Sequence, residues 1–363
     1  MLNVIHPNAT DISYATQPKS RRVLLVGGAG YIGGPLTTHL LNLGYHVRTL
    51  DLLVYQNANS VLAHMSHPRY EFQLGDMGNL EVLVRALRGV TDVVILAGLV
   101  GDPITKSFPH YAGAINEIAL RKCIDALSGR GLGKVVFVST CSNYGIIGKD
   151  EIADETFPLR PVSLYAQAKV AAERHIISLK RHVDYCPTIL RFATAFGIAP
   201  RMRFDLTVNE FTRELFIGRD LEVYDADTWR PYCHVRDFAR LISLVLEADP
   251  SAVAFEVFNA GGDENNHTKR DIAELVSRRL AGRRILYRKS SSDPRDYRVG
   301  FKKVRTRLGF EPAVTVGDGV EEILDALKSG FFSDAEERRT SYGNYDLPGL
   351  QRVSRPEQAH AAQ

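Results

Sequence analysis

The first two hundred residues alternate between two patterns of apolar positions. Short apolar or alternating runs predict strands at residues 23–26, 45–51, 70–74, 90–97, 134–139 and 186–191. Between them, apolar residues at helical spacing predict helices at residues 31–43, 79–88, 111–128 and 162–180. Six strands separated by helices predict an α/β fold in which a doubly wound parallel sheet is covered on both faces.

The pattern changes after Gly197. Residues 198–234 mix short helix and strand signals with several arginines, before clear helical periodicity returns at residues 235–247. Further elements are predicted at 255–259 and 284–288 (strands) and at 269–281 and 316–328 (helices). We therefore predict an N-terminal extension (1–20), a sheet domain (21–197, which 235–260 rejoins), a smaller mixed lobe (198–234 and 261–333) and a polar tail (334–363), mobile or draped over a neighbour.

A glycine-rich turn follows the first predicted strand. Gly27, Gly30 and Gly33 form the pattern GxxGxxG between an apolar run and a predicted helix. One glycine allows a tight turn, one lets a diphosphate approach the backbone, and one lets the helix pack closely on the strand. Free N–H groups at the start of the helix favour phosphate. The glycines alone fit an ordinary turn, but in this context they predict the dinucleotide site of a Rossmann-type domain.

An acidic residue ends the second predicted strand. Asp51 lies 24 residues after Gly27. A carboxylate at this place accepts hydrogen bonds from the ribose hydroxyls of the adenosine half and repels a 2′-phosphate. The position therefore predicts NAD rather than NADP as the cofactor, although an acidic loop residue without a ligand is the plainer alternative.

A tyrosine and a lysine lie four residues apart on the helix predicted at residues 162–180. Tyr165 and Lys169 share one face of that helix. A buried ammonium beside a phenol stabilises the phenolate, so we expect Lys169 to lower the pKa of Tyr165 and to make it a base for an alcohol proton. The spacing alone occurs often by chance, but here it follows a strand that ends in Ser139 and Thr140.

The composition limits the possible partners. The chain has 363 residues, 45% of them apolar, and a net charge of +3, which is too mild to demand nucleic acid or an anionic membrane. The four cysteines form no CxxC pair, so neither a zinc site nor a disulfide framework is indicated. No apolar run is long enough to span a bilayer, and the first twenty residues do not resemble a secretory signal. We therefore expect a cytoplasmic protein.

Five motifs together resemble those of the extended short-chain dehydrogenase/reductases, in the group of NAD-dependent sugar-nucleotide epimerases and dehydratases. They lie at residues 27–33, 139–145, 165–169, 230–237 and 293–296. The resemblance covers residues 21 to 330. It implies a Rossmann-type domain, a bound NAD, a nucleoside-diphosphate sugar as substrate, and a homodimer formed through the helices after the fourth and fifth strands.

The resemblance also implies roles at matching positions. Thr140 would hydrogen-bond the reacting hydroxyl, Tyr165 would act as the acid/base, and Lys169 would bind the nicotinamide ribose. The implied cofactor contacts are Gly27, Gly30, Tyr31, Ile32, Gly33, Asp51, Asp76, Met77, Ala97, Tyr165 and Lys169. The implied substrate contacts are Asn116, Thr140, Asn209, Arg230 and Arg295, the two arginines holding the diphosphate. For Arg201, Arg203 and Arg219, surface ion pairs are the plainer expectation. No metal site is predicted.

The sequence departs from the family pattern where the dehydratases carry their acid. Those enzymes have Asp-Glu after the hydroxyl residue, and here Cys141 and Ser142 stand in those places. A thiol and an alcohol replace a carboxylic acid poorly in expelling water, so we predict no dehydration. Cys141 is expected to fill the pocket wall, with an acid/base role in epimerisation as the alternative. Thr194 and Val26 replace a family asparagine and threonine, which concerns the substrate rather than the fold.

These observations predict an NAD-dependent enzyme that oxidises a ring hydroxyl of a nucleoside-diphosphate sugar, at C4, to a ketone. A 4-epimerase is the favoured outcome. The alternatives are a net C4 dehydrogenase or reductase, for example on a GDP-sugar, and a non-catalytic NAD-binding regulator. Residues 196–209 resemble C4-oxidising GDP-sugar enzymes, whereas the retention of both Tyr165 and Lys169 argues against a regulator. The basic pairs at 283–284 and 288–289 are interpreted as solvated charges rather than an RNA site.

Overall fold

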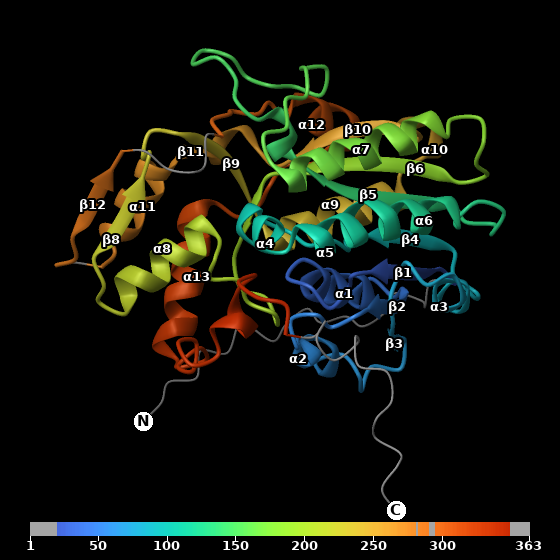
Figure 1. Ribbon diagram of the computed structural model, residues 1–363, viewed down its shortest axis with the longest axis horizontal. Coiled ribbons are helices and arrows are strands. Elements are labelled where there is room, and N and C mark those ends of the chain that lie inside the picture. Colours follow the sequence, from blue (N-terminus) through green and yellow to red (C-terminus); the bar gives the residue numbers. More distant parts are fainter. Residues whose placement is uncertain (1–19, 281, 290–294, 349–363) are drawn as a thin grey trace, which may run out of the picture.

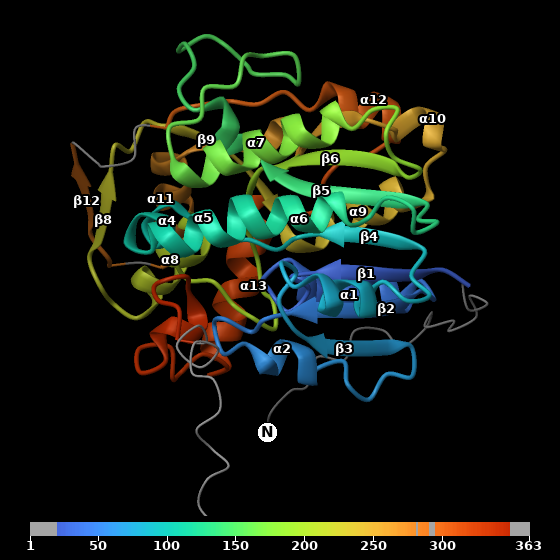
Figure 2. The same ribbon diagram turned by 45° about the vertical axis from the view of Figure 1, so that its right-hand side comes forward.

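A seven-stranded parallel sheet forms the centre of the molecule. The computed structural model describes residues 20–280, 282–289 and 295–348. The strands follow the order β10-β6-β5-β4-β1-β2-β3, and Figure 2 shows them one above another from β3 to β6. They are β1 (Arg22–Val26), β2 (His46–Asp51), β3 (Tyr70–Leu74), β4 (Asp92–Ile95), β5 (Lys134–Thr140), β6 (Cys186–Phe192) and β10 (Glu256–Ala260). The predicted doubly wound parallel sheet is confirmed.

Helices cover both faces of this sheet, which explains why its strands are apolar on both sides. On one face, α1 (Gly33–Asn42) and α9 (Val235–Glu247) pack on Val23 and Leu25. On the other face lie α3 (Leu80–Ala86), α6 (Leu120–Asp125) and α7 (Leu164–Ser178). Shorter helices are α2 (Ala58–Leu62), α4 (Asp102–Ser107), α5 (Pro109–Gly113), α10 (Pro250–Val253) and α12 (Lys302–Leu308). In the part of the chain described, no helix is both long and apolar enough to cross a bilayer.

The helix predicted over residues 111–128 is interrupted. The structure divides it into α5, a π-helical turn η1 (Ala114–Ala119) and α6. Asn116 lies in the π-helical turn, and its side chain hydrogen-bonds both backbone groups of Leu99. The widened turn therefore coincides with a side chain that fixes the loop after β4.

A smaller lobe lies beside the carboxyl ends of the strands (Figure 1). It contains a three-stranded sheet in the order β11-β9-β7 and a two-stranded sheet of β12 and β8. Its strands are β7 (Thr194–Phe196), β8 (Leu221–Tyr224), β9 (Trp229–His234), β11 (Asn266–Thr268) and β12 (Ile285–Arg288). Its helices are α8 (Thr207–Phe216), α11 (Lys269–Ser277) and α13 (Val316–Lys328), with 3-10 turns η3 (Asp263–Asn265) and η4 (Arg339–Tyr342). A separate apolar core holds this lobe together.

The C-terminal segment differs from the tail predicted at residues 334–363. Residues 334–348 fold back against the molecule, with Ala335, Asn344 and Leu347 buried. Leu347 packs with Tyr55 and Leu99 in a small apolar cluster of its own. Most residues of this segment are polar, and its three buried residues follow no helix or strand periodicity. The sequence pattern therefore did not predict that the segment packs against the rest of the chain. Residues 349–363 of the tail, residues 1–19 of the predicted extension, and Asp293 and Pro294 lie outside the described residues.

Candidate active site

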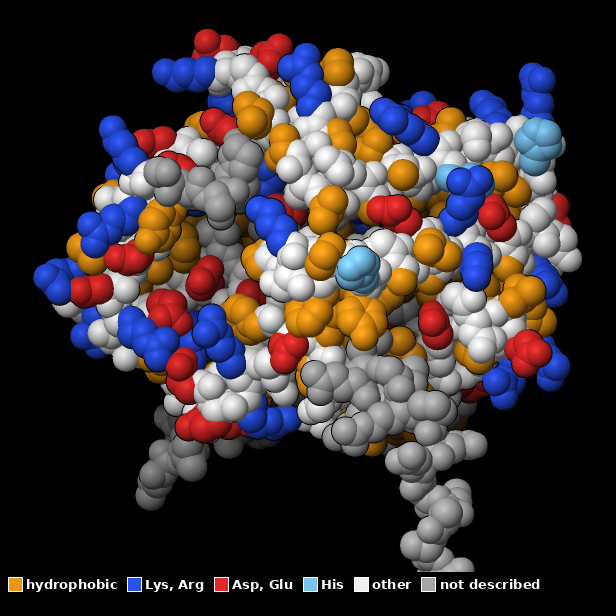
Figure 3. All heavy atoms as spheres, in the orientation of Figure 1, with side chains coloured by type: hydrophobic (Ala, Val, Ile, Leu, Met, Phe, Trp, Pro, Cys, Tyr) orange, Lys and Arg blue, Asp and Glu red, His pale blue; other side chains and the backbone are white. Residues whose placement is uncertain are grey.

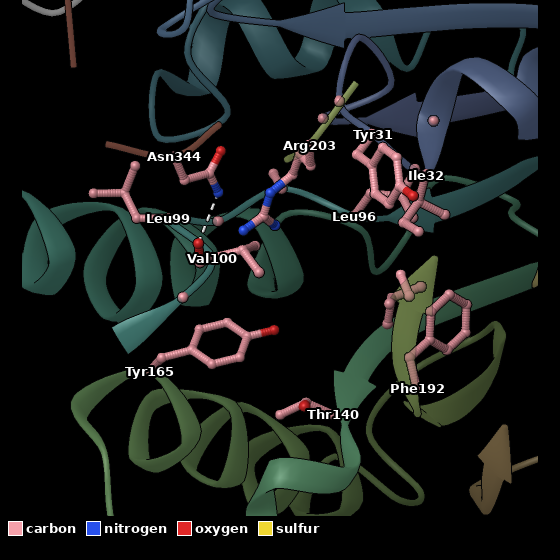
Figure 4. Close-up of a pocket in the computed structure, with 18 of the residues that line it drawn as sticks. Tyr31, Ile32, Leu96, Leu99, Val100, Thr140, Tyr165, Phe192, Arg203 and Asn344 are labelled. Atoms are coloured by element: carbon pink, nitrogen blue, oxygen red, sulfur yellow. Dashed lines mark hydrogen bonds between the residues drawn. The ribbon is translucent and has the colours of Figure 1, made fainter. Parts of the chain in front are cut away.

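A cavity of about 430 Å³ opens at the carboxyl ends of β1, β4 and β5, between the sheet and the smaller lobe. Ligands in open α/β sheets bind at this edge. Figure 4 shows Tyr165 and Thr140 extending into the cavity from one side, and Tyr31, Ile32 and Arg203 from the other. All the predicted cofactor contacts line this cavity, as do Thr140, Arg230 and Arg295.

The glycine-rich turn leaves no room for side chains. Gly27 has a φ of 84°, and a Cβ there would lie 2.6 Å from the backbone of Ala97. A Cβ on Gly33 would lie 2.2 Å from the carbonyl oxygen of Gly28. These distances are far below contact, so glycine is required at both positions. The turn therefore exposes backbone to the cavity in the way a diphosphate needs.

Asp51 holds the loop beside this turn. It ends β2, and its carboxylate accepts the N–H groups of Ala29 (3.0 Å) and Leu53 (2.8 Å). Burial raises the pKa of Asp51, and these hydrogen bonds and the nearby Arg201 oppose the rise. Asp76 and Met77 follow β3 and line the same cavity. The residues present therefore fit the adenosine half of a dinucleotide.

Thr140, Tyr165 and Lys169 meet at the middle of the cavity. Thr140 is the last residue of β5, and its hydroxyl accepts the N–H of Ser142 at 3.1 Å. Tyr165 and Lys169 lie in the first two turns of α7, whose start is capped by the Ser163 side chain. The Lys169 ammonium donates to the Val138 carbonyl at 2.8 Å and lies 5.9 Å from the centre of the Tyr165 ring. The predicted residues thus share one wall.

The pKa of Tyr165 differs from the prediction. Burial raises it, and the groups that oppose the rise are Arg203 and Arg295 rather than Lys169, while Asp102 adds to it. Burial also lowers the pKa of Lys169 to about 8, with Glu173 opposing. Desolvation of this buried phenol outweighs the charges around it, so the predicted net lowering of its pKa is wrong for the ligand-free protein.

Arg230 and Arg295 line the part of the cavity near Ser142 and Tyr297. The Arg295 guanidinium donates to the Ser142 hydroxyl at 3.3 Å and forms an ion pair with Asp102 at 3.2 Å. Arg230 lies over the ring of Tyr297, with its charged carbon 5.0 Å from the ring centre. Both arginines line the same cavity as Thr140 and Tyr165, as a diphosphate clamp requires.

Asn116 and Asn209 lie behind the cavity wall and do not line it. Asn116 holds the backbone of Leu99, its amide oxygen accepting at 2.7 Å and its amide nitrogen donating at 3.0 Å. Asn209 accepts the N–H of Gly197 at 3.1 Å and donates to the hydroxyl of Tyr31 at 2.9 Å. In this structure both side chains hold loops beside the cavity, and their predicted contacts with the substrate stay a prediction.

Cys141 also differs from the prediction that it fills the pocket wall. Its side chain is buried in the apolar core beneath the sheet, and its thiol donates to the Arg191 carbonyl at 3.1 Å. Burial raises the pKa of this thiol. Ser142 is the residue that faces the cavity. Cys141 begins the 3-10 turn η2 (Cys141–Tyr144) directly after β5, and in this turn its thiol lies in the core while the next residue, Ser142, reaches the cavity.

Two cavity residues were missed by the sequence reasoning. Arg201 and Arg203, expected as surface ion pairs, are only 5% and 6% exposed and line the cavity. Arg203 forms a two-pronged pair with Asp205, at 2.9 Å and 2.5 Å. Arg201 stacks on Tyr55, with its charged carbon 4.1 Å from the ring centre. Met202 and Phe204 between them are buried as well, so the alternation of cationic and apolar residues gave no signal of this; residues 343 and 344, far along the chain, provide the contacts of Arg201.

No described group of three or more His, Cys, Asp or Glu side chains could hold a metal ion.

The cavity combines a phosphate-binding turn, an acid suited to a ribose, and a hydroxyl, phenol and amine in one wall. This combination defines a nicotinamide-dependent oxidoreductase of the Rossmann type. The chain belongs to the NAD dependent epimerase/dehydratase family, whose sequence profile matches residues 23–261. The resemblance predicted from the motifs is confirmed.

The similar proteins include enzymes of two activities on nucleotide sugars. The chain is 27% identical over 317 residues to a dTDP-glucose 4,6-dehydratase of Streptomyces niveus, a match that covers 84% of this chain and 92% of that one. It is 25% identical over 317 residues to a UDP-glucose 4-epimerase of Bacillus subtilis, with 80% and 91% covered. Each match extends over nearly the whole length of the relative, so the sheet domain and the smaller lobe are shared together.

Solved structures give the same picture. A dTDP-glucose 4,6-dehydratase from Streptomyces venezuelae with NAD bound has a TM-score of 0.77 at 26% identity, covering 85% of this chain and 97% of that one. A UDP-glucose 4-epimerase from Thermus thermophilus in complex with NAD has a TM-score of 0.72 at 25% identity, covering 85% and 99%. Family and structures confirm the predicted fold and the predicted NAD cofactor.

Proposed function

We propose that this protein is a 4-epimerase of a nucleoside-diphosphate sugar. The observation that carries the proposal is the shared wall of Thr140, Tyr165 and Lys169, set between a dinucleotide turn and a pair of arginines suited to a second diphosphate. The relatives named above act on such sugars according to their names. NAD, when bound, accepts a hydride from the substrate carbon and returns it.

In this proposal each protein group has one task. The Thr140 hydroxyl hydrogen-bonds the C4 hydroxyl of the sugar, and Tyr165 takes its proton as the C4–H bond breaks and the ketone forms. The same phenol gives the proton back when the alcohol is restored on the other face. Arg230 and Arg295 hold the diphosphate while the sugar turns over, because guanidinium forks match phosphate oxygens.

Dehydration is disfavoured by the side chains beside Thr140. Cys141 is buried in the core with a raised pKa, and the Ser142 hydroxyl contacts Tyr297 (3.1 Å) and Arg295. Neither group can deliver a proton to a leaving hydroxyl as a carboxylic acid does. These contacts support the interpretation that the product keeps all its oxygen atoms.

The test is incubation with UDP-, dTDP- and GDP-sugars followed by NMR of the products. We expect inversion at C4 of one of these sugars without net formation of NADH. Accumulation of NADH with a keto-sugar would establish a net dehydrogenase instead. The absence of any change in a broad panel of sugars, with NAD bound, would contradict the proposal.

The proposal includes a homodimer in the cytoplasm. Apolar side chains gather on the face that carries α4, α5 and α7 (Figure 3), and they include the exposed Tyr111, Ile118, Leu164 and Ile177. A face of this kind on adjacent helices suits a second copy of the chain. All four cysteines are free, which fits a reducing compartment. Light scattering of the purified protein tests the dimer.

A further inference from the structure

Arg201 carries a buried charge that the protein itself satisfies incompletely. Its hydrogen bonds within the described residues go to neutral oxygens, the Gly343 carbonyl (3.3 Å) and the Asn344 side chain (2.7 Å). Its Nε has no partner there, and neither have the hydroxyl of Tyr55 and the amide oxygen of the cavity-lining Asn57. Burial and then the neighbouring Arg203 lower the pKa of Arg201 to about 10. Such a group fits an anionic ligand.

The position of this charge indicates which anion. Arg201 stacks on Tyr55 in the loop after β2. Its positive charge is close enough to Asp51, the predicted ribose ligand, to oppose the rise in the pKa of that carboxyl. Arg203 extends between Tyr31 of the glycine-rich turn and the loop at Val100 (Figure 4). The other arginine pair, Arg230 and Arg295, lies with Ser142 and Tyr297 instead. Arg201 and Arg203 therefore line the part of the cavity beside the dinucleotide turn and the loops after β2 and β4.

The C-terminal segment holds this pair in place. The Asn344 amide donates to the Val100 carbonyl at 2.7 Å, and the Asn344 backbone donates to Asp205 at 3.2 Å. The backbone of Phe204 donates to the Tyr342 carbonyl at 2.7 Å. Leu347 fills the apolar cluster with Tyr55 and Leu99. Residues 342–347 thus connect the loop after β4 to the strip 201–205 across the cavity.

We propose that Arg201 and Arg203, fastened by residues 342–347, form a latch over the diphosphate of the bound dinucleotide and retain NAD between turnovers. The proposal deepens the proposed function, on which it rests for its consequence. A cofactor that stays bound must give its hydride back to the sugar before the next cycle, which is what a 4-epimerase needs and a net dehydrogenase does not.

The test measures exchange of bound NAD with radiolabelled NAD in the full-length protein, together with the NAD content after gel filtration. Arg201→Gln removes the charge, and Asn344→Ala loosens the segment while keeping Arg201. Arg284→Gln is the matched control, because the Arg284 side chain is 76% exposed and pairs with Asp220 on the surface of the smaller lobe. Binding of UDP, dTDP and GDP is measured in parallel, since a substrate diphosphate has the same chemistry. Circular dichroism verifies folding of each variant.

We expect Arg201→Gln and Asn344→Ala to accelerate NAD exchange at least tenfold, with nucleoside-diphosphate binding changed less than twofold and Arg284→Gln like the wild type. Exchange within twofold of the wild type in both variants would overturn the latch. Weakened binding of nucleoside diphosphates with unchanged NAD exchange would assign the arginines to the substrate and also overturn it. A protein that retains NAD through Arg201 but converts no sugar would support the latch and contradict the proposed function.

Discussion

The two ends of the cavity hold their positive charge in different ways. At the proposed substrate end, Arg295 is paired with the Asp102 carboxylate and the Ser142 hydroxyl. At the proposed cofactor end, Arg203 is likewise paired with a carboxylate, that of Asp205, but Arg201 is buried against neutral oxygens and an aromatic ring. An arginine that is paired with a carboxylate can release it to bind a phosphate, and can pair with the carboxylate again when the phosphate leaves. For Arg201, whose hydrogen bonds go to neutral oxygens, the nearby carboxylates of Asp205 and Asp51 offset the cost of burial only in part, so an added anion would stabilise it further. Under the proposals above, the first arrangement suits a ligand that is exchanged at each turnover, and the second a ligand that stays bound.

The largest expected effect comes from a substitution that should abolish the chemical step while leaving ligand binding at both ends of the cavity intact. Tyr165→Phe removes the proton-accepting hydroxyl from the wall between them, so we expect kcat to fall about a thousandfold. NAD content and nucleoside-diphosphate binding should stay within twofold of the wild type, because the ring remains. Product NMR and binding calorimetry check the two statements. Wild-type turnover in this variant would remove Tyr165 from the reaction.

A second prediction concerns the amine in the same wall. Burial lowers the pKa of Lys169 from 10.5 to about 8 in the folded chain. Between these values the unfolded chain binds more protons, so the free energy of unfolding rises with pH through this window. Relative to Lys169→Met, the wild type should gain about 3 kcal/mol across the interval between these two pKa values. Urea unfolding at a series of pH values measures the difference, and a flat difference would show that the ammonium is not desolvated.

Binding at the proposed substrate end can be weakened without affecting the cofactor end. Arg295→Gln removes one fork of the proposed diphosphate clamp, and a charged hydrogen bond of this kind is worth enough to raise the Kd of the nucleoside-diphosphate sugar about thirtyfold. NAD exchange should be unaffected. Arg201→Gln is expected to do the opposite, accelerating NAD exchange while leaving nucleoside-diphosphate binding nearly unchanged. Equal effects of both variants on both ligands would erase the distinction between the two ends.

The smallest expected effect tests how the cofactor end of the cavity selects NAD over NADP. Asp51→Asn keeps the shape of the side chain but removes the charge that repels a 2′-phosphate. We expect the preference for NAD over NADP, as a ratio of Kd values, to fall about tenfold. Fluorescence titration with both dinucleotides measures it. An unchanged ratio would mean that the shape of the loop 52–55, rather than the carboxylate, selects the cofactor.

What could be predicted from the sequence is what is local in the chain. The glycine-rich turn, Asp51 at a strand end, and the spacing of Tyr165 and Lys169 each depend on a few neighbouring residues. Once the parallel sheet was inferred, its carboxyl edge brought them together. The same reasoning predicted the main strands and helices up to residue 197, but it missed the short elements α2, α4 and β7 and the break in the helix at 111–128.

The rest depends on contacts between distant segments. Arg201 and Arg203 look like surface arginines until residues 342–347 cover them, some 140 positions later in the chain. Asn116 and Asn209 have the residue type of substrate ligands but lie behind the wall, because their amides satisfy buried backbone groups. The sign of the pKa shift at Tyr165 follows from burial, which a helical spacing does not reveal.

The hydroxyl of Tyr31 fastens the two lobes to each other at the floor of the cavity. It donates to the Gly197 carbonyl at 2.6 Å and accepts from Asn209, so the turn after β1 and the start of the smaller lobe share a buried hydrogen-bonded junction. The opposite rim is closed by the amide of Asn344 on Val100. A movement that separates the two lobes at this cavity therefore has to break either the buried hydrogen bonds of Tyr31 or the hydrogen bond between Asn344 and Val100.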